Sequence, residues 1–382
     1  MLSVLSPVLR ETFQLNETLY GNIAAAFQLS YAIGYLVLGK AIDKFGTRTG
    51  LAVAAVVWSF ASALHATVSD AAQFGAWRAL LGFSEGANFP ACSKAVAEWF
   101  PAEERALATG IYNAGVNLAS VIGPPAFVAI TANYGWRVCF TAISITGLFW
   151  VAAWLACCPA MPPRIVPPPK GRPLSELLGL RTTWAFILGK VFVDPVWYFL
   201  LFWLPLYFHD SLKLRMNQIG WVLPFIYFLS GAGSVLAGWL SGVLLRRGLT
   251  VRRARLAILF TCAVVAPCSL AGAMGGGLYR SAILFGIAAA AHQAYSSIAF
   301  TIPGDVFSSS DVATVLGLGG SAGAFTSVMF SAILPGYLIP RIGYTPLLLV
   351  LPLGYLVAAG IAARLYGAFE AEGTGTMVKD LP

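Results

Sequence analysis

The stretch TLYGNIAAAFQLSYAIGYLVLG (residues 18–39) contains no Asp, Glu, Lys or Arg, and it runs directly into the basic segment KAIDKFGTR (residues 40–48). About 20 apolar residues in a helix are enough to cross the hydrocarbon core of a bilayer. Because lipid offers the backbone no hydrogen-bond partners, such a stretch must satisfy its own amides and carbonyls as a helix. Residues 18–39 therefore predict a membrane-spanning helix that ends in a basic turn.

The same pattern repeats along the chain. Only 10% of the 382 residues are charged and 58% are hydrophobic, whereas an ordinary soluble domain carries about 25% charged residues. Nine stretches of at least 21 residues lack Asp, Glu, Lys and Arg, and two more are long enough but interrupted by charges: 18–39, 49–69, 106–136, 138–163, 216–245, 256–279, 281–304, 312–340 and 342–363, then 71–93 and 182–208. The sequence predicts an all-α polytopic membrane protein with about eleven spans.

Lys and Arg residues gather in alternate connections between the predicted spans. One set of connections holds 16 of the 24, the other holds six, and Arg78 and Lys190 lie within spans. The positive-inside rule places the richer set, and with it the C-terminus, in the cytoplasm. The net charge of +8 then reflects topology and contact with anionic membrane lipid, so no nucleic-acid partner is expected.

This orientation makes the span at 18–39 run inward, so residues 1–17 begin outside. We expect the apolar residues 1–9 to be the last turns of a first helix that lies largely upstream of this sequence. A truncated homologue that does not transport is therefore one alternative for the chain as written.

A Pro-rich segment divides the predicted spans into two groups. Residues 159–173 contain seven prolines, which rules out a continuous helix and favours an extended, exposed connector. We expect an N-terminal helix bundle at 1–158, a cytoplasmic linker at 159–182 and a C-terminal helix bundle at 183–382. Two such halves around a central cavity are the usual build of secondary transporters.

Four embedded charges fall in two of the predicted spans. Arg78 and Glu85 are seven residues apart, and Lys190 and Asp194 are four apart, so each pair shares one helix face. A charge at the bilayer centre costs roughly 3 kcal/mol on insertion scales, so these groups should face a cavity or a partner. Each pair is either a self-neutralising structural ion pair or part of a site that binds an anion and carries a proton. We favour the site, with Glu85 as the proton carrier.

Other polar residues in the spans are secondary candidates. They would hydrogen-bond a hydroxylated ligand, or equally join neighbouring helices; they are Tyr31, Asn113, Asn117, Trp197, Tyr198, His292 and Gln293. Asp194 precedes Pro195, which should weaken the helix and leave polar backbone at the cavity. The six cysteines lie in or beside predicted spans and are interpreted as small buried hydrophobes. No P-loop, metal-ligand cluster or hydrolytic constellation appears, so we expect no cofactor and no enzyme activity.

Several motifs resemble one known family. The turn from Gly39 to Arg48 resembles the signature after the second span of the major facilitator superfamily. RALLGFSEGANFPA (78–91), EWFP (98–101) and GIYN (110–113) resemble its anion:cation symporter family, and DPVWY (194–198), FWLP (202–205), HQA (292–294) and PGDVF (303–307) resemble the hexuronate transporter branch. The resemblance covers nearly the whole chain, although Ile298 stands where relatives often have asparagine.

The resemblance implies twelve helices in two bundles, alternating access and proton-coupled uptake of organic anions such as sugar acids. It implies roles in substrate binding for Arg78 and Tyr31 and in proton coupling for Glu85. A basic residue and a carboxylate occur in the hexuronate branch where Lys190 and Asp194 stand.

The whole sequence thus predicts a monomeric symporter of the bacterial inner membrane that imports a hexuronate or related sugar acid with protons. The predicted substrate-binding residues are Arg78, Tyr31, Asn113, Lys190, Trp197 and Gln293, the proton-coupling residues are Glu85 and Asp194, and the gating residues are Gly39, Asp43 and Arg48. An exchanger or uniporter for another organic anion, such as an aldonate or an aromatic or dicarboxylic acid, remains the alternative.

Overall fold

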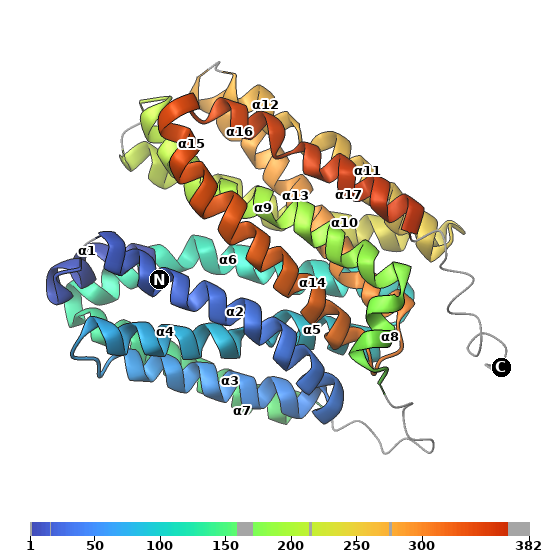
Figure 1. Ribbon diagram of the computed structural model, residues 1–382, viewed down its shortest axis with the longest axis horizontal. Helices are drawn as coiled ribbons and strands as arrows, with labels where there is room; N and C mark the ends of the chain where they lie inside the picture. Colours follow the sequence, from blue (N-terminus) through green and yellow to red (C-terminus); the bar gives the residue numbers. More distant parts are fainter. Residues whose placement is uncertain (1, 16, 159–170, 214–215, 275–276, 366–382) are drawn as a thin grey trace.

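The computed structural model describes residues 2–15, 17–158, 171–213, 216–274 and 277–365. Within these residues every regular element is a helix (Figure 1). Ten of the helical segments are long and apolar enough to cross a membrane. These ten segments correspond to ten of the eleven predicted spans, and the exception is the stretch 71–93.

The N-terminal part of the chain forms seven helices. They are α1 (Leu2–Phe13), α2 (Glu17–Phe45), α3 (Thr47–His65), α4 (Ala71–Glu85), α5 (Asn88–Trp99), α6 (Ala102–Tyr134) and α7 (Trp136–Cys157). The predicted span 71–93 is divided here into α4 and α5 at Gly86. A Cβ atom on Gly86 would lie 2.6 Å from the backbone nitrogen of Tyr35 in α2, so glycine permits the two helices to touch at this break.

The C-terminal part forms the remaining helices. They are α8 (Leu174–Gly179), α9 (Arg181–Asp210), α10 (Met216–Arg246), α11 (Val251–Val265), α12 (Cys268–Ala273), α13 (Leu278–Val306), α14 (Val312–Ser327), the π-helix η1 (Val328–Ile333), α15 (Leu334–Ile342), α16 (Thr345–Val350) and α17 (Leu353–Leu365). Each predicted span in this part corresponds to one of these helices or to consecutive ones, such as α11 with α12.

The helices fall into two groups that lie one above the other in Figure 1, α1–α7 and α9–α17. Extensive contacts join the groups where α2 meets α14 and where α6 meets α10. Small residues permit this approach: a Cβ atom on Gly238 of α10 would lie 2.7 Å from the Cα of Leu107 in α6. Ser234 of α10 also donates a 2.9 Å hydrogen bond to the carbonyl oxygen of Gly110 in α6. We propose that 1–158 and 183–382 are the two structural units.

In the described chain, the connections between the membrane-crossing segments fall at the two ends of the bundle. One end, on the right of Figure 1, holds the turn at Gly46 and the connections at 100–101, 247–250 and 307–311, and we call it the basic end. The richer set of Lys and Arg residues belongs to this end in the described chain. The alternation of basic and less basic connections seen in the sequence is thus a real division between two ends of the molecule.

The expected extended connector covers residues 159–173, of which 159–170 lie outside the described chain and 171–173 are not helical. The rest of the predicted linker includes the short helix α8. Leu177 of α8 is fully buried against Phe186 and Val312. The backbone nitrogen of Arg172 donates a 2.8 Å hydrogen bond to Asp311, which fastens the end of the connector to the start of α14.

Pro195 does not interrupt its helix, since α9 continues from Arg181 to Asp210. Proline removes the amide that would normally reach the carbonyl of Val191. The hydroxyl of Thr326 lies 3.4 Å from that oxygen, and Ser331 donates a 2.7 Å hydrogen bond to the carbonyl of Pro195 itself. Neighbouring side chains therefore satisfy the backbone that we expected to face the cavity.

The cysteines are all free, as expected. Cys139, Cys158 and Cys262 are buried, but Cys157 is exposed at the surface of the bundle, so its interpretation as a buried residue was wrong. Cys157 ends α7 at the basic end, where the packing of neighbouring helices does not cover it.

Candidate substrate site

A cavity of about 300 Å³ lies between the two groups of helices. Its wall comes from α2, α4, α5 and α6 on one side and from α9, α13 and α14 on the other. The lining residues are Phe27, Gln28, Tyr31, Tyr35, Glu85, Phe89, Asn113, Val116, Asn117, Ser120, Lys190, Asp194, Trp197, Tyr198, Leu201, His292, Gln293, Ser296, Phe300, Gly320 and Ala324. Seven of the eight predicted substrate and proton residues are in this wall, and Arg78 is not.

Lys190 and Asp194 form the ion pair that their spacing predicted. The Nζ atom of Lys190 lies 2.8 Å from Oδ1 of Asp194, and the two side chains are only 9% and 14% exposed. The same ammonium group lies 4.2 Å from the centre of the Phe300 ring, within the range of a cation–π contact. Lys190 is thus held at the cavity wall by one carboxylate and one aromatic face.

Glu85 lies on the opposite side of the cavity, at the end of α4. Within the described residues no cation lies within 4.0 Å of its carboxylate. The two acidic residues of the wall therefore differ, because Asp194 is paired and Glu85 is not.

Arg78 stands behind the cavity wall rather than in it. Its guanidinium carbon lies 4.3 Å from the centre of the Phe27 ring, and Phe27 in turn stacks on Tyr31 with ring centres 5.8 Å apart. The Nε atom of Arg78 is buried without a hydrogen-bond partner among the described residues. The expectation that both charges of α4 face the cavity is met by Glu85 only, since the aromatic ring of Phe27 covers Arg78.

Amides and hydroxyls gather on the side formed by α6 and α13. The side-chain nitrogen of Asn113 donates to Ser297 at 3.2 Å and to Gln293 at 3.4 Å, so the two helix groups are joined directly at the cavity. Asn117 donates to the carbonyl of Asn113 at 3.1 Å. The sequence left open whether such residues join helices or line a cavity. In the structure, Asn113 and Gln293 do both.

Three aromatic rings line the wall of the cavity where it faces the basic end. Tyr35 stacks on Phe89 with ring centres 6.4 Å apart, and Phe89 stacks on Phe300 at 5.0 Å. Tyr35 and Phe300 come from opposite helix groups, so the stack bridges them. These residues were not singled out from the sequence, although Tyr35 follows Tyr31 by one helical turn and shares its face.

Asp43 ties α2 to α14 at the basic end. Its carboxylate lies 2.6 Å from Nζ of Lys94, and it accepts hydrogen bonds from the backbone nitrogen and the hydroxyl of Thr314, both at 2.6 Å. The backbone nitrogen of Ala313 adds a fourth bond at 3.2 Å. The negative charge of Asp43 thus lies at the first turn of α14, where unpaired amides and the helix dipole stabilise an anion.

A second tie at this end was missed from the sequence. Asp305 of α13 accepts from Arg105 of α6 at 3.1 Å and from Arg255 of α11 at 3.0 Å. Arg255, which is 1% exposed, also donates to the carbonyl of Ala102 at 2.8 Å. Arg105 and Asp305 lie 200 residues apart, so no local pattern could have paired them.

The other two predicted gating residues differ from each other. Gly39 faces α14, and a side chain there would collide with the carbonyl of Ala313. Arg48 does not reach the opposite group in the structure: it donates to the carbonyls of Leu155 and Cys158 at 2.8 and 2.9 Å, at the end of α7. Arg48 therefore joins α3 to the end of α7, within its own group of helices.

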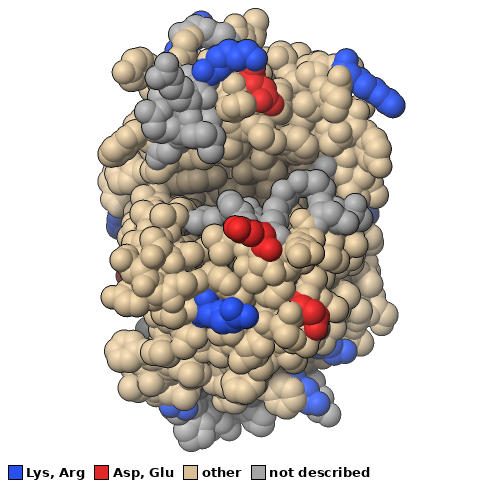
Figure 2. All heavy atoms as spheres, turned by 90° about the vertical axis from the view of Figure 1, so that its left-hand side faces the viewer, with Lys and Arg blue, Asp and Glu red and all other residues tan. Residues whose placement is uncertain are grey.

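The far end of the molecule looks different from the basic end. Figure 2 shows this face, which is hollowed between the two helix groups and carries scattered charges. The described ties between Asp43 and α14 and between Arg105 and α13 both lie at the basic end. The described residues contain no group of three or more His, Cys, Asp or Glu side chains that could hold a metal ion.

A family model named Major Facilitator Superfamily matches residues 1–325. The chain belongs to this superfamily. It is a multi-pass membrane transporter of that superfamily and not an enzyme. The hexuronate transporter of Escherichia coli (strain K12) is 28% identical over 380 residues, which covers 93% of this chain and 86% of that protein.

Two further comparisons agree with this assignment. A probable galactarate/D-glucarate transporter of the same E. coli strain is 27% identical over 290 residues, or 66% of this chain and 65% of that protein. The solved structure of the proton:xylose symporter XylE matches with a TM-score of 0.73 at 15% identity, over 95% of this chain and 91% of that one. The predicted all-helical fold is therefore confirmed.

Proposed function

We propose that this transporter imports a monocarboxylate sugar acid, a hexuronate, together with protons. The observation that carries the proposal is a cavity wall that combines one ammonium group, two carboxylates, several amides and hydroxyls, and aromatic rings. These groups match the carboxylate, the hydroxyls and the apolar ring face of a uronic acid. The similarity to the E. coli hexuronate transporter over 93% of the chain supports the same class of substrate.

The charge of the cavity favours a substrate with one carboxylate rather than two. Among the described lining residues Lys190 is the only Lys or Arg, and it is already paired with Asp194. A substrate carboxylate that joins Lys190 would share it with Asp194. A second carboxylate would find no further Lys or Arg among the described lining residues, and Glu85 would repel it for as long as Glu85 is charged. A hexarate, the substrate class named for the relative at 27% identity, fits this wall less well.

The size of the cavity and its polar groups are consistent with a single sugar ring. Small-molecule pockets span about 300–1,000 Å³, and this cavity of about 300 Å³ is at the lower end. Tyr31, Asn113 and Gln293 present hydrogen-bonding groups for ring hydroxyls. Trp197 offers an aromatic face, which suits the C–H face of a sugar.

Proton coupling is assigned to Glu85. A carboxylate without an adjacent cation is expensive to keep charged away from water, and a proton removes that charge. Arrival of the proton and of the substrate would together lower the electrostatic cost of closing the two halves around the loaded site. Asp194 is the second proton-coupling candidate, because a substrate carboxylate at Lys190 would displace it from its partner.

The closed basic end suggests the order of events. We place this end in the cytoplasm by the positive-inside rule, so the cavity would load from outside. Inward opening then requires the ties of Asp43 to Thr314 and of Asp305 to Arg105 to separate, as the halves rock around the site. We further propose that the protein acts as a monomer in the bacterial inner membrane, surrounded by lipid and with its C-terminus in the cytoplasm.

A thermal-shift screen of the purified protein tests the substrate class. D-galacturonate and D-glucuronate should raise the melting temperature, whereas galactose and galactarate should leave it unchanged. Reconstituted vesicles should then concentrate the radiolabelled uronate when the interior is alkaline, and a protonophore should abolish the gradient-driven part. A melting shift with galactarate alone would overturn the monocarboxylate assignment, and uptake that never exceeds equilibrium would indicate a uniporter or an exchanger.

A further inference from the structure

His292 on α13 is held by aromatic neighbours on two sides. Its ring stacks on Trp197 of α9, with ring centres 4.8 Å apart and planes 9° from parallel. Its Nδ1 atom is hydrogen-bonded to the hydroxyl of Tyr355 in α17. His292 is 4% exposed and lines the cavity, whereas Tyr355 is 1% exposed and is not part of the cavity wall.

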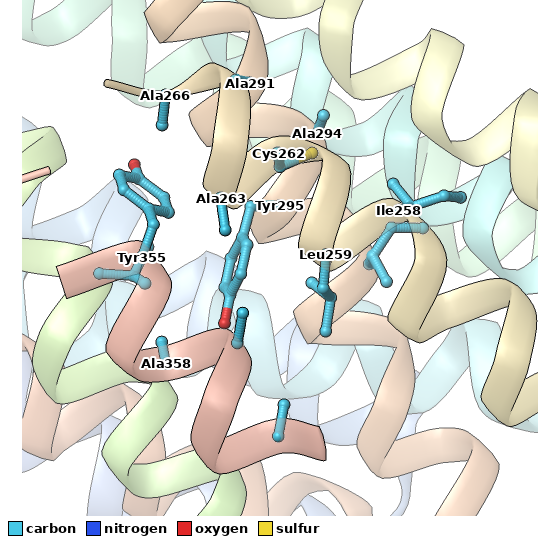
Figure 3. Packing of buried hydrophobic residues seen from close by; sticks show 14 of the residues in the cluster. Ile258, Leu259, Cys262, Ala263, Ala266, Ala291, Ala294, Tyr295, Tyr355 and Ala358 are labelled. Atoms are coloured by element: carbon cyan, nitrogen blue, oxygen red, sulfur yellow. The ribbon is translucent and has the colours of Figure 1, made fainter. Parts of the chain in front are cut away.

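Tyr355 belongs to a tightly packed, apolar region of the molecule. Figure 3 shows it among the small side chains of α11, α13 and α17, with Ala263, Ala266 and Ala358 nearby. Its ring meets Tyr295 edge-on at 5.5 Å. Such packing leaves the ring little freedom, so its hydroxyl has a fixed position relative to α13.

The direction of the hydrogen bond follows from the surroundings of Tyr355. The described residues provide its hydroxyl with one hydrogen-bond partner, Nδ1 of His292. If Nδ1 carried the proton, the hydroxyl hydrogen would be buried without an acceptor, which costs about 1–3 kcal/mol. If the hydroxyl donates instead, Nδ1 accepts and both groups are satisfied. A neutral imidazole has one donor and one acceptor nitrogen, so the proton of His292 then resides on Nε2.

Nε2 is the nitrogen that remains for the cavity. It has no hydrogen-bond partner among the described residues. It is also absent from the side-chain atoms that are both unpartnered and completely covered by protein. Since His292 lines the cavity, we infer that this N–H group is open to it.

We propose that Tyr355 is a positioning residue that fixes His292 as the Nε2–H tautomer, so that His292 donates a neutral hydrogen bond to an oxygen atom of the bound solute. The hydrogen bond from His292 to the solute rests on the proposed sugar-acid substrate. The assignment of the tautomer does not depend on that substrate. The α17 helix thereby influences recognition, although in the described residues it contributes no side chain to the cavity wall.

The tautomer can be measured without any substrate. The chain contains three histidines, so protein labelled with ¹⁵N-histidine and placed in nanodiscs gives few signals. The signals that disappear in His292→Gln belong to His292. We expect them to show an unprotonated Nδ1 and a protonated Nε2 at neutral pH, and Tyr355→Phe should convert them to a mixture of tautomers. A protonated Nδ1 in the wild type, or the same signals in Tyr355→Phe, would overturn the proposal.

Tyr295→Phe is the matched control for this measurement. It removes a neighbouring buried hydroxyl from the same cluster and leaves the bond between Tyr355 and His292 in place. Its His292 signals should equal those of the wild type. A change of the same size in Tyr295→Phe would mean that the tautomer responds to packing in general and would contradict a specific role for Tyr355.

Binding measurements test the second part of the proposal. One net hydrogen bond is worth about 0.5–1.5 kcal/mol, so Tyr355→Phe should raise the Kd for a uronate about 2- to 12-fold. In a His292→Gln background the same substitution should change Kd no further. Equal effects in both backgrounds would show that Tyr355 does not act through His292. If no uronate binds the wild type, the proposed substrate fails while the tautomer result still stands.

Discussion

The ammonium group of Lys190 lies 2.8 Å from Asp194 on its own helix and 4.2 Å from the ring centre of Phe300 on α13. One cation is therefore shared between a carboxylate and an aromatic face at the wall of the central cavity. Across the cavity, Glu85 has no such partner among the described residues. In the proposed mechanism this asymmetry distinguishes an anion-binding side from a proton-accepting side, and it leads to the following predictions.

Lys190→Gln should weaken uronate binding about 10- to 100-fold. A hydrogen bond to a charged group contributes about 1.5–3 kcal/mol, and glutamine keeps a donor for Asp194 while it removes the positive charge. Isothermal titration on detergent-solubilised protein measures this loss. Asp194→Asn is the matched control: it leaves Lys190 unneutralised, so affinity for the anion should not fall. Equal losses in the two variants would show that the pair acts as a structural unit.

Glu85→Gln should abolish uphill uptake driven by a pH gradient while substrate exchange continues. Glutamine has the shape of a protonated glutamate but releases no proton. Reconstituted vesicles report accumulation and counterflow separately. Glu176→Gln on α8, where the side chain is 55% exposed, should behave as the wild type. Vesicles with Glu85→Gln that still concentrate the substrate would remove Glu85 from the coupling mechanism.

Arg78→Ala should weaken binding less than Lys190→Gln does. The sequence alone predicted that Arg78 binds the anion, but in the structure Arg78 does not line the cavity, and its guanidinium group packs on Phe27, which does. The two Kd values, measured side by side, decide the matter. A larger loss for Arg78→Ala would mean that Phe27 moves aside when the substrate binds.

Asp43→Asn should loosen the contact between α2 and α14. The substitution removes the charge that binds Lys94 and the amides of Ala313 and Thr314. Hydrogen exchange should therefore become faster in peptides that cover 312–317. Asp70→Asn is a suitable comparison, because Asp70 caps α4 by accepting from Gln73 at 2.8 Å and has no role between the halves. Unchanged exchange at 312–317 would show that Asp43 does not hold the basic end closed.

Gly39→Ala should hinder closure of the basic end and lower the transport rate. An added Cβ atom would collide with the carbonyl of Ala313, which belongs to the opposite group of helices. Gly115→Ala on α6 makes the same chemical change where no atom lies within 4 Å, so it should keep its activity and gain helix stability of about 0.5–1 kcal/mol. Similar rates for the two variants would exclude close packing at Gly39 as a requirement.

Much of the fold could be predicted because it depends on local physics. A run of apolar residues such as 18–39 has only the helix open to it in lipid, and the basic turns that follow alternate runs define one end of the bundle. The pairing of Lys190 with Asp194 was equally local, since a spacing of four places both on one helix face. Polar side chains in apolar helices tend to face a cavity, and five that were predicted to do so line it: Glu85, Tyr31, Asn113, Trp197 and Gln293.

Errors arose where a neighbouring helix decided the outcome. The spacing of Arg78 and Glu85 predicts a common face, but the ring of Phe27 from another helix covers only Arg78. Ile298, at the position where the sequence was expected to differ from its relatives, is fully buried in a core cluster and is not among the residues that line the cavity. Helical periodicity gives the angle between side chains of one helix and carries no information about what covers that face.

The sequence by itself therefore determined the helices, the two ends and the polar groups available to a cavity, because each depends on residues close together in the chain. Only the tertiary structure decided which groups meet: Asp43 with Thr314, Arg105 with Asp305, and His292 with Tyr355. These partners come from different helices, whose relative rotation and depth are fixed by the packing of the whole bundle.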